Sequence, residues 1–228
     1  MRLIRWVIAG AVLLVLAAIG LGAWYVFGSS SPAKPTLAPT ATTIAGGPAT
    51  VDGTWHVQTG TNVFAGYRMT EVFAGDVVHK TAVGRTPAVS GTLVIAGSRV
   101  TAVDVVADLQ QLSSDRSQRD EYIHSHGLES DTFHDAEFKL TTPITLPAPA
   151  RKGVVEKLTA VGKLTLHGVT RTVTVPLQAR WDGPSIDVDA SGIPIVLADY
   201  HIVPPDTGVV KVDDHGSFEL ALHFVAAG

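Results

Sequence analysis

The stretch GKLTLHGVTRTVTVPL, Gly162 to Leu177, contains two runs in which apolar and polar residues alternate. A period of two gives each run one apolar face and one polar face when it is extended as a β-strand. The connection between the runs, residues 167–170, contains Gly168, which accepts the positive φ that a tight hairpin needs. The stretch therefore predicts an antiparallel β-hairpin whose apolar face must be buried against other parts of the chain.

The same alternation recurs from Trp55 to the end of the chain. It predicts strands within residues 63–69, 89–95, 101–109, 137–141, 158–166, 173–181, 186–190, 195–197, 209–212 and 217–225. Turn signals between them include Gly60, Gly75, Gly84, Pro87 and the bend Gly192–Pro194. Many short strands with a single helical interruption are typical of an antiparallel barrel or sandwich. Because closure removes vulnerable sheet edges, we expect an all-β, eight-stranded antiparallel barrel, whose interior either packs solid or holds one small ligand.

Residues 113–133 break the alternation and predict a short helical insertion. Ser113 or Ser114 suits the N-cap of a helix, and Gly127 suits the position just after its end. We expect one short helix, followed by an irregular or second helical turn.

The adjacent pair Arg119 and Asp120 lies within this predicted helix. Neighbouring helix residues do not face each other, so the two side chains serve different partners. In a structural reading, Arg119 ties the helix to a carboxylate or carbonyl of the barrel, and Asp120 caps a neighbouring loop. In a functional reading, the pair contacts the polar head of a ligand.

The composition excludes several function classes. The chain has 228 residues, a formal net charge of −4 and no cysteine, so disulfides, thiol nucleophiles and thiolate metal sites are absent. Its charges are mixed in sign and offer no nucleic-acid surface. There is no nucleophile elbow, phosphate loop or dinucleotide fingerprint. His124 and His126 point to different faces of a helix, so we expect no metal site, no cofactor, no catalytic residue and no enzymatic activity.

The N-terminal region predicts a membrane anchor. Arg2 and Arg5 precede an uncharged apolar run from Trp6 to Phe27, which is long enough to span a bilayer as a helix. The arginines favour a cytoplasmic tail, residues 1–5, so the remainder would lie outside the cytoplasmic membrane in a single-pass topology. The alternative is a cleaved signal peptide, which has a shorter apolar core and a small-residue cleavage site.

Residues 28–53 are rich in Ser, Thr, Pro, Ala and Gly. Such a segment cannot bury enough apolar surface to offset the cost of ordering it. It is predicted to be a linker, which separates the anchor from a barrel domain at residues 54–228.

Two blocks of sequence resemble the YceI-like family of lipocalin-like, polyisoprenoid-binding proteins. The resemblance covers about residues 54–225, and His134 replaces a proline that the family often has. The matching positions are Ser114, Arg119-Asp120, Phe133 and Ala136-Glu137-Phe138 in the first block, Gly162–Arg171 in the second, and Gly66-Tyr67-Arg68 and Ala198-Asp199-Tyr200 elsewhere.

The resemblance implies a barrel that holds a long isoprenoid lipid or isoprenoid quinone and catalyses no reaction. We therefore expect a membrane-anchored lipid-binding protein, in which Tyr67 can also hydrogen-bond a head group. From the alternation, the residues expected to contact the ligand are Val63, Tyr67, Val103, Val105, Leu164, Val175, Val188, Leu220 and Leu222. The alternative is a solid-cored interaction module on a stalk, which binds a protein or a cell-envelope component. The low aromatic content of 7% favours an open cavity.

Overall fold

The computed structural model describes residues 31–37, 49–73 and 78–227. Its strands are β1 (Gly53–Val57), β2 (Phe64–Phe73), β3 (Val78–Thr86), β4 (Val89–Ala96), β5 (Arg99–Asp108), β6 (Ser113–Ser114), β7 (Asp135–Thr142), β8 (Ile144–Thr145), β9 (Val155–Leu166), β10 (Val169–Trp181), β11 (Ser185–Val196) and β12 (Val210–Ala226). Its helical segments are η1 (Leu109–Gln111), α2 (Ser117–Tyr122), η2 (Ile123–Gly127) and η3 (Leu197–Tyr200).

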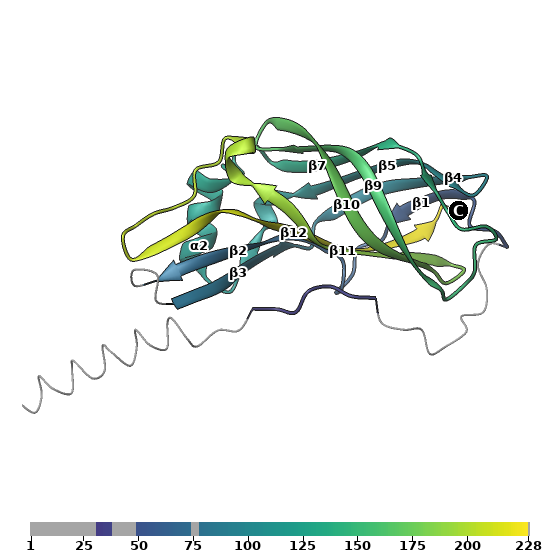
Figure 1. Ribbon diagram of the computed structural model, residues 1–228, viewed down its shortest axis with the longest axis horizontal. Coiled ribbons are helices and arrows are strands. Elements are labelled where there is room, and N and C mark those ends of the chain that lie inside the picture. Colours follow the sequence, from purple (N-terminus) through teal and green to yellow (C-terminus); the bar gives the residue numbers. More distant parts are fainter. Residues whose placement is uncertain (1–30, 38–48, 74–77, 228) are drawn as a thin grey trace, which may run out of the picture. The chain divides into compact units, whose positions relative to one another are not determined.

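The strands form a closed eight-stranded antiparallel barrel (Figure 1), as the sequence predicts. Several walls consist of two successive elements: β1 and β2 follow each other along one edge of β12, and β3 and β4 pair with β2 and β1. β7 and β8 both pair with β5, while β9, β10, β11 and β12 are long single strands. Pairing of β12 with β1 closes the sheet, so the barrel has no free edge along most of its length.

The hairpin of β9 and β10 has the predicted form. Its ladder runs from the Val169–Leu166 pair to the Arg180–Val155 pair, so both strands begin earlier than the sequence pattern indicates. The turn residues His167 and Gly168 have φ values of 49° and 72°, as a two-residue hairpin turn requires.

Three strands depart from simple alternation. A register shift in β5 leaves Thr101 as an extra, exposed residue, and Val100, which lies just before the predicted strand at residues 101–109, is buried. A second shift at Gly192, with φ of 72°, lets β11 continue to Val196 where we predicted a bend. β12 is one strand with an irregularity between Val212 and Gly216, where we predicted two strands.

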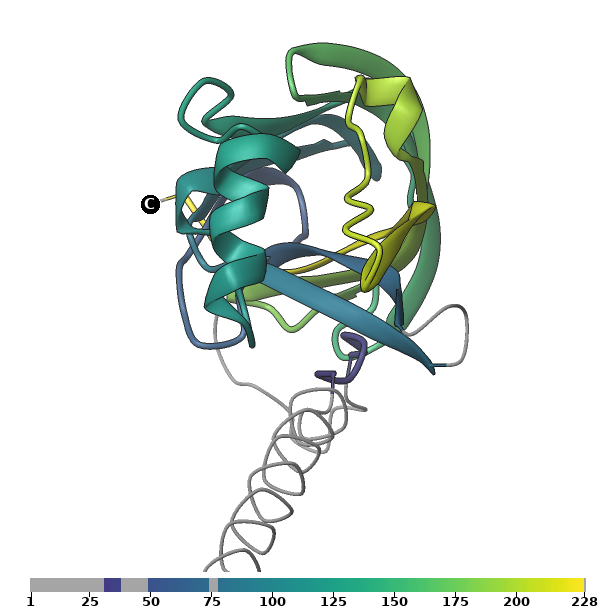
Figure 2. The ribbon, with the colours of Figure 1, turned by 90° about the vertical axis from the view of Figure 1, so that its left-hand side faces the viewer.

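The insertion is helical but begins later than predicted. Ser113 and Ser114 form β6 instead of a helix cap, and the residue before α2 is Arg116, which makes no capping side-chain hydrogen bond. The Ser114 hydroxyl instead accepts a hydrogen bond from the Arg116 backbone N–H at 3.2 Å. Gly127 is the last residue of the π-helical turn η2, not the residue after a helix end. Figure 2 shows α2 over one side of the barrel end that faces the viewer.

The core is divided along the barrel axis. One cluster contains Trp55, Trp181 and Phe224, and the other, near α2, contains Tyr67 and Leu166. A third cluster, around Ala160, Val175, Ala190 and Ile193, joins the walls of β9, β10 and β11.

The predicted membrane-spanning segment, residues 6–27, lies outside the residues that the structure describes. Among the described residues, no helix is long and apolar enough to cross a bilayer.

Candidate functional site

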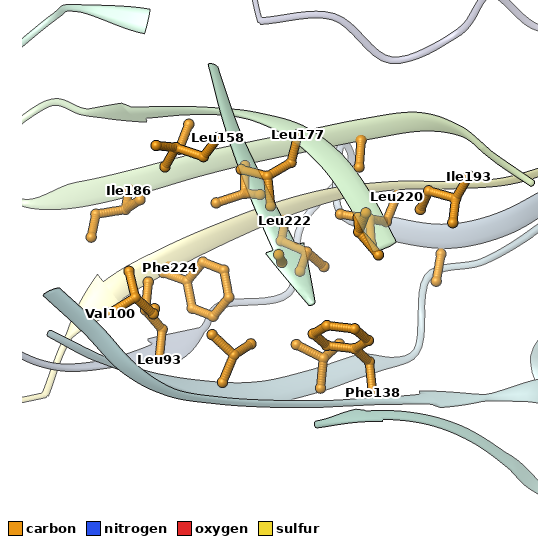
Figure 3. Close-up of a pocket in the computed structure, with 18 of the residues that line it drawn as sticks. Leu93, Val100, Phe138, Leu158, Leu177, Ile186, Ile193, Leu220, Leu222 and Phe224 are labelled. Atoms are coloured by element: carbon orange, nitrogen blue, oxygen red, sulfur yellow. The ribbon is translucent and has the colours of Figure 1, made fainter. Parts of the chain in front are cut away.

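The barrel encloses an apolar cavity of about 240 Å³ (Figure 3). Leu158, Leu177, Leu220, Leu222 and Phe138 extend into it from four different strands. The polar or charged residues along its wall are Tyr67, Thr86, Arg151, Glu156 and Glu219. Within the described ranges, no three His, Asp or Glu side chains are placed to hold a metal ion. A lining of this kind suits a hydrocarbon ligand.

Two small side chains line the cavity among larger ones. Ala160 and Ala190 are buried, with 4% and 3% of their surfaces exposed, and both line the cavity. Ala160 pairs across the sheet with Val175, and Ala190 pairs with Leu177 and with Leu220. Two alanines among larger aliphatic residues leave space that leucine or isoleucine would fill.

Two aromatic rings of the cavity lie against glycines of neighbouring strands. A Cβ atom at Gly162 would lie 2.4 Å from Cζ of Phe138, and one at Gly84 would lie 2.3 Å from Cε1 of Tyr67. Gly84 is therefore an interior residue of β3 and not the turn that we predicted. Each ring lies over a neighbouring strand's backbone at a position where no side chain intervenes.

Exposed residues line the cavity beside β9, in a stretch that we call the β8–β9 opening and define as residues 144–158. β7 pairs with β9 only from Val161 to Thr165, and in the described part of the chain no ladder continues along Val155–Ala160 on that side. Pro147 and Arg151 line the cavity and are exposed. The barrel wall is thus incomplete beside β9.

The structure places all the predicted ligand-contact residues except Val63 along the cavity. Val63 is buried beside Trp55 in the core cluster and does not line the cavity. The alternation of apolar and polar residues predicts an inward side chain for Val63, but Val63 lies just before β2 and not within it. The lining residues are Tyr67, Val103, Val105, Leu164, Val175, Val188, Leu220 and Leu222. Their contact with a lipid stays a prediction.

Sequence reasoning missed lining residues that the same periodicity indicates. Phe138 alternates with Glu137 and Lys139 on a predicted strand, and Ala160 lies on the same face as Leu164. Extending each alternating face to its full length would have found both. Val51 also lines the cavity although we assigned it to the linker, because it is buried just before β1.

At the α2 end, Tyr67 presents a buried phenol to the cavity. Only 9% of its surface is exposed, and its Oη has no hydrogen-bond partner in the described part of the chain. Burial raises the pKa of the phenol above its ordinary value, while the positive charge of Arg119 opposes this shift. The phenol is therefore protonated at neutral pH and can donate one hydrogen bond.

Arg119 and Asp120 make contacts of the kind that the structural reading expects, although both side chains also bond to Ser114. Arg119 donates from Nε to Oε1 of Glu71 at 2.6 Å and from Nη2 to Oε2 at 2.8 Å, which ties α2 to β2. Its Nη1 donates to Asp115 at 2.5 Å and to Ser114 at 3.0 Å. The Ser114 hydroxyl donates to Asp120 at 2.6 Å, so Asp120 holds the segment before the helix.

A second ion cluster stiffens the wall formed by β12, β2 and β3. The Glu219 side chain is fully buried and accepts hydrogen bonds from Arg68 Nε and, at 2.8 Å, from Arg85 Nε. Arg85 also donates from Nη2 to the Ala33 carbonyl at 2.8 Å. Two guanidinium groups neutralise the carboxylate, so Glu219 does not leave an uncompensated charge beside the apolar cavity.

Known structures have the same barrel. A polyisoprenoid-binding domain from Saccharophagus degradans superposes with a TM-score of 0.58 at 17% identity, over 77% of this chain and 99% of that one. BcnA from Burkholderia cenocepacia gives a TM-score of 0.51 at 20% identity, over 71% of this chain and 96% of that one. The YceI protein of Campylobacter jejuni gives 0.51 at 14% identity, over 64% and 85%.

The comparison with curated protein sequences gives no match. The family model for the YceI-like domain, in contrast, matches residues 39–224, which include every described strand up to most of β12. The matched region contains the hairpin, the helical insertion and the cavity. The chain therefore belongs to the family of YceI-like domains.

Proposed function

We propose that this protein takes up one long isoprenoid chain, as a polyprenyl lipid or isoprenoid quinone, and stores or transfers it without chemical change. The observation that carries the proposal is the apolar cavity inside a closed barrel. The similarity to a polyisoprenoid-binding domain supports it. Each isoprene unit removed from water would contribute roughly 2–4 kcal/mol, from about 0.8 kcal/mol for each buried CH₂ group.

A bilayer already shelters the same chain, so transfer from membrane to barrel is nearly neutral in free energy. Access to the lipid then controls the exchange. An anchor at residues 6–27 would keep the barrel on the outer side of the cytoplasmic membrane and raise its effective concentration at the lipid source.

The β8–β9 opening is the proposed route of entry. The barrel ladder needs no disruption there, because no strand pairs with Val155–Ala160 on that side within the described residues. The cavity of about 240 Å³ lies just below the usual range of ligand pockets, roughly 300–1,000 Å³. A long chain would therefore be only partly enclosed unless wall side chains move.

Filling the cavity should abolish lipid binding. Val175 is buried opposite Ala160, and its replacement by Trp would place a large side chain in the cavity beside this alanine. We expect Val175→Trp to lower the amount of isoprenoid lipid that co-purifies with the full-length protein by at least tenfold, as measured by lipid extraction and mass spectrometry. Val105→Trp and Leu164→Trp replace other residues that line the cavity. They should also lower the amount of co-purifying lipid.

The matched control is Thr174→Trp, on the adjacent and exposed position of the same strand. It adds the same side chain outside the barrel and should leave lipid content unchanged. Near-ultraviolet circular dichroism establishes that the variants are folded. Equal lipid contents in folded Val175→Trp and Thr174→Trp proteins would favour the interaction-module alternative.

The proposed anchor has its own test. We expect Edman sequencing of the protein from bacterial membranes to begin at or near Met1, because residues 6–27 are longer than the apolar core of a cleaved signal peptide. Protease added to intact spheroplasts should digest the barrel domain. A mature chain that begins after Phe27, or a barrel protected from protease, would contradict the proposed topology.

A further inference from the structure

The β8–β9 opening contains a short exposed segment that is held to the barrel on both sides. The backbone N–H of Leu146 donates to the carbonyl of Ser98 at 2.9 Å, and the N–H of Gly153 donates to the carbonyl of Trp181 at 2.9 Å. The segment between these two hydrogen bonds, residues 147–152, is called the opening loop below. It is therefore fixed in place beside the cavity that its own residues help to line.

The opening loop presents small apolar groups and cations to solvent. Pro147, Ala148 and Pro149 are exposed, and so are Arg151 and Lys152. Proline has no backbone N–H, so this part of the loop has few donors that would lose hydrogen bonds on leaving water. Apolar groups next to cations suit the surface of a bilayer, where carbon is sheltered and positive charge meets phosphate.

Cations predominate around the opening loop. The β8–β9 opening contains three Lys or Arg residues and one Glu. Its third cation, Lys157, is exposed on β9, and the exposed Arg99 pairs along the backbone with Thr145 of β8. The acidic residues here are Glu156, which is half-buried, and the exposed Asp52, whose carboxylate accepts a hydrogen bond from the turn between β4 and β5. This end of the barrel therefore carries a net positive charge.

The other end of the barrel has the opposite charge. α2 lies there, away from β1 and β4 (Figure 1). Residues 108–135 contain seven Asp or Glu and two Arg residues, and residues 197–215 contain four Asp and one Lys. This end also has the exposed side chains of Val203 and Val209. Because like charges repel, an anionic surface would turn this end away and attract the β8–β9 opening.

From this arrangement we propose that the β8–β9 opening docks on an anionic lipid bilayer, with the opening loop at the level of the head groups. The cations that face the bilayer are Arg99, Arg151, Lys152 and Lys157. The inference rests on the proposed function, because a barrel that exchanges lipid with a membrane has to present its opening to the bilayer. An apolar chain would then pass between membrane and cavity without crossing water.

The absence of cysteine allows one introduced label to report which end touches the membrane. Ala148→Cys in the opening loop and Val209→Cys at the other end each receive an environment-sensitive fluorescent dye. Full-length protein is reconstituted without isoprenoid into nanodiscs of phosphatidylcholine, or of phosphatidylcholine with about one third phosphatidylglycerol. In the anionic discs alone, we expect the dye at position 148 to emit at shorter wavelength and to be quenched by spin-labelled lipid. The dye at position 209 should report water in both.

Charge removal tests whether the cations cause the docking. The triple variant Arg99→Gln/Lys152→Gln/Lys157→Gln changes residues that do not line the cavity. Each Lys or Arg near an anionic membrane strengthens association by about fivefold, so the triple variant should lower the docking constant by at least tenfold. Salt at about 1 M, which shortens the screening length to about 3 Å, should also release the dye at position 148 from the bilayer.

The matched control is the triple variant Lys163→Gln/Arg171→Gln/Lys211→Gln. It removes as many exposed charges outside the β8–β9 opening and should leave docking unchanged. Near-ultraviolet circular dichroism checks that both triple variants are folded.

Docking and lipid binding can fail separately. The docking surface is wrong if neither dye responds, if position 209 enters the bilayer instead, if both kinds of disc give the same response, or if the two triple variants act alike. Co-purification of isoprenoid lipid with the unlabelled protein would still support the proposed function in each of these cases. If position 148 docks as expected and no isoprenoid co-purifies, the docking surface stands and the proposed function is wrong.

Discussion

Leu166→Asp should lower the free energy of unfolding by about 5 kcal/mol. Removal of a buried leucine alone costs roughly 2–5 kcal/mol, and a carboxyl group in an apolar interior adds a desolvation cost or is forced to remain protonated. Leu166 is 2% exposed and lines the cavity at the end of β9. Because domains of this size are stable by about 5–15 kcal/mol in total, the variant should be close to unfolded at 25 °C.

Chemical denaturation followed by circular dichroism measures this effect. Thr174→Asp, at an exposed position of the paired strand β10, introduces the same carboxylate into water and should change stability by less than about 0.5 kcal/mol. Similar losses in the two variants would mean that the inward and outward faces of the hairpin are assigned incorrectly.

Glu219→Gln should be the second severe change, with a loss of about 3–5 kcal/mol in the free energy of unfolding. Glu219 has a fully buried side chain, and the side chain of its partner Arg68 is 9% exposed. A neutral amide at position 219 would remove the carboxylate that is paired with the buried Arg68 guanidinium. Arg85 is less affected, since 26% of its side chain is exposed and it can turn toward water.

Two further variants show whether the charge causes this loss. Glu137→Gln removes a carboxylate from an exposed pair with Lys139 and should cost less than about 1 kcal/mol. The double variant Glu219→Gln/Arg68→Met removes both buried charges and should recover most of the stability lost in Glu219→Gln. Additive losses in the double variant would instead indicate that packing, and not the loss of the buried charge pair, explains the effect.

The sequence pattern predicts the barrel because alternation reports which face of a strand is buried. It does not report an extra residue within a strand, so the exposure of Thr101 and the burial of Val100 could not be predicted. A bulge shifts the period without changing the composition. The continuation of β11 past Gly192 was missed for the same reason.

The candidate site is predictable in its chemistry but not in its volume. Periodicity assigned Val175 and Leu220 to the interior, yet the space between them depends on Ala160 and Ala190 across the sheet, which alternation alone does not bring together. The same limit applies to Tyr67. Its inward direction follows from the pattern, whereas the position of its ring against Gly84 of the neighbouring strand does not.

The incomplete wall beside β9 has a consequence for selectivity. A pocket that is closed at both ends encloses its whole ligand, so it excludes a ligand that is a few carbons too long. If the proposed ligand extends out of the barrel through the β8–β9 opening, only its enclosed portion contacts the protein. The proposed lipid-binding protein would then discriminate poorly by chain length, and would bind homologous lipids that differ in their number of repeating units.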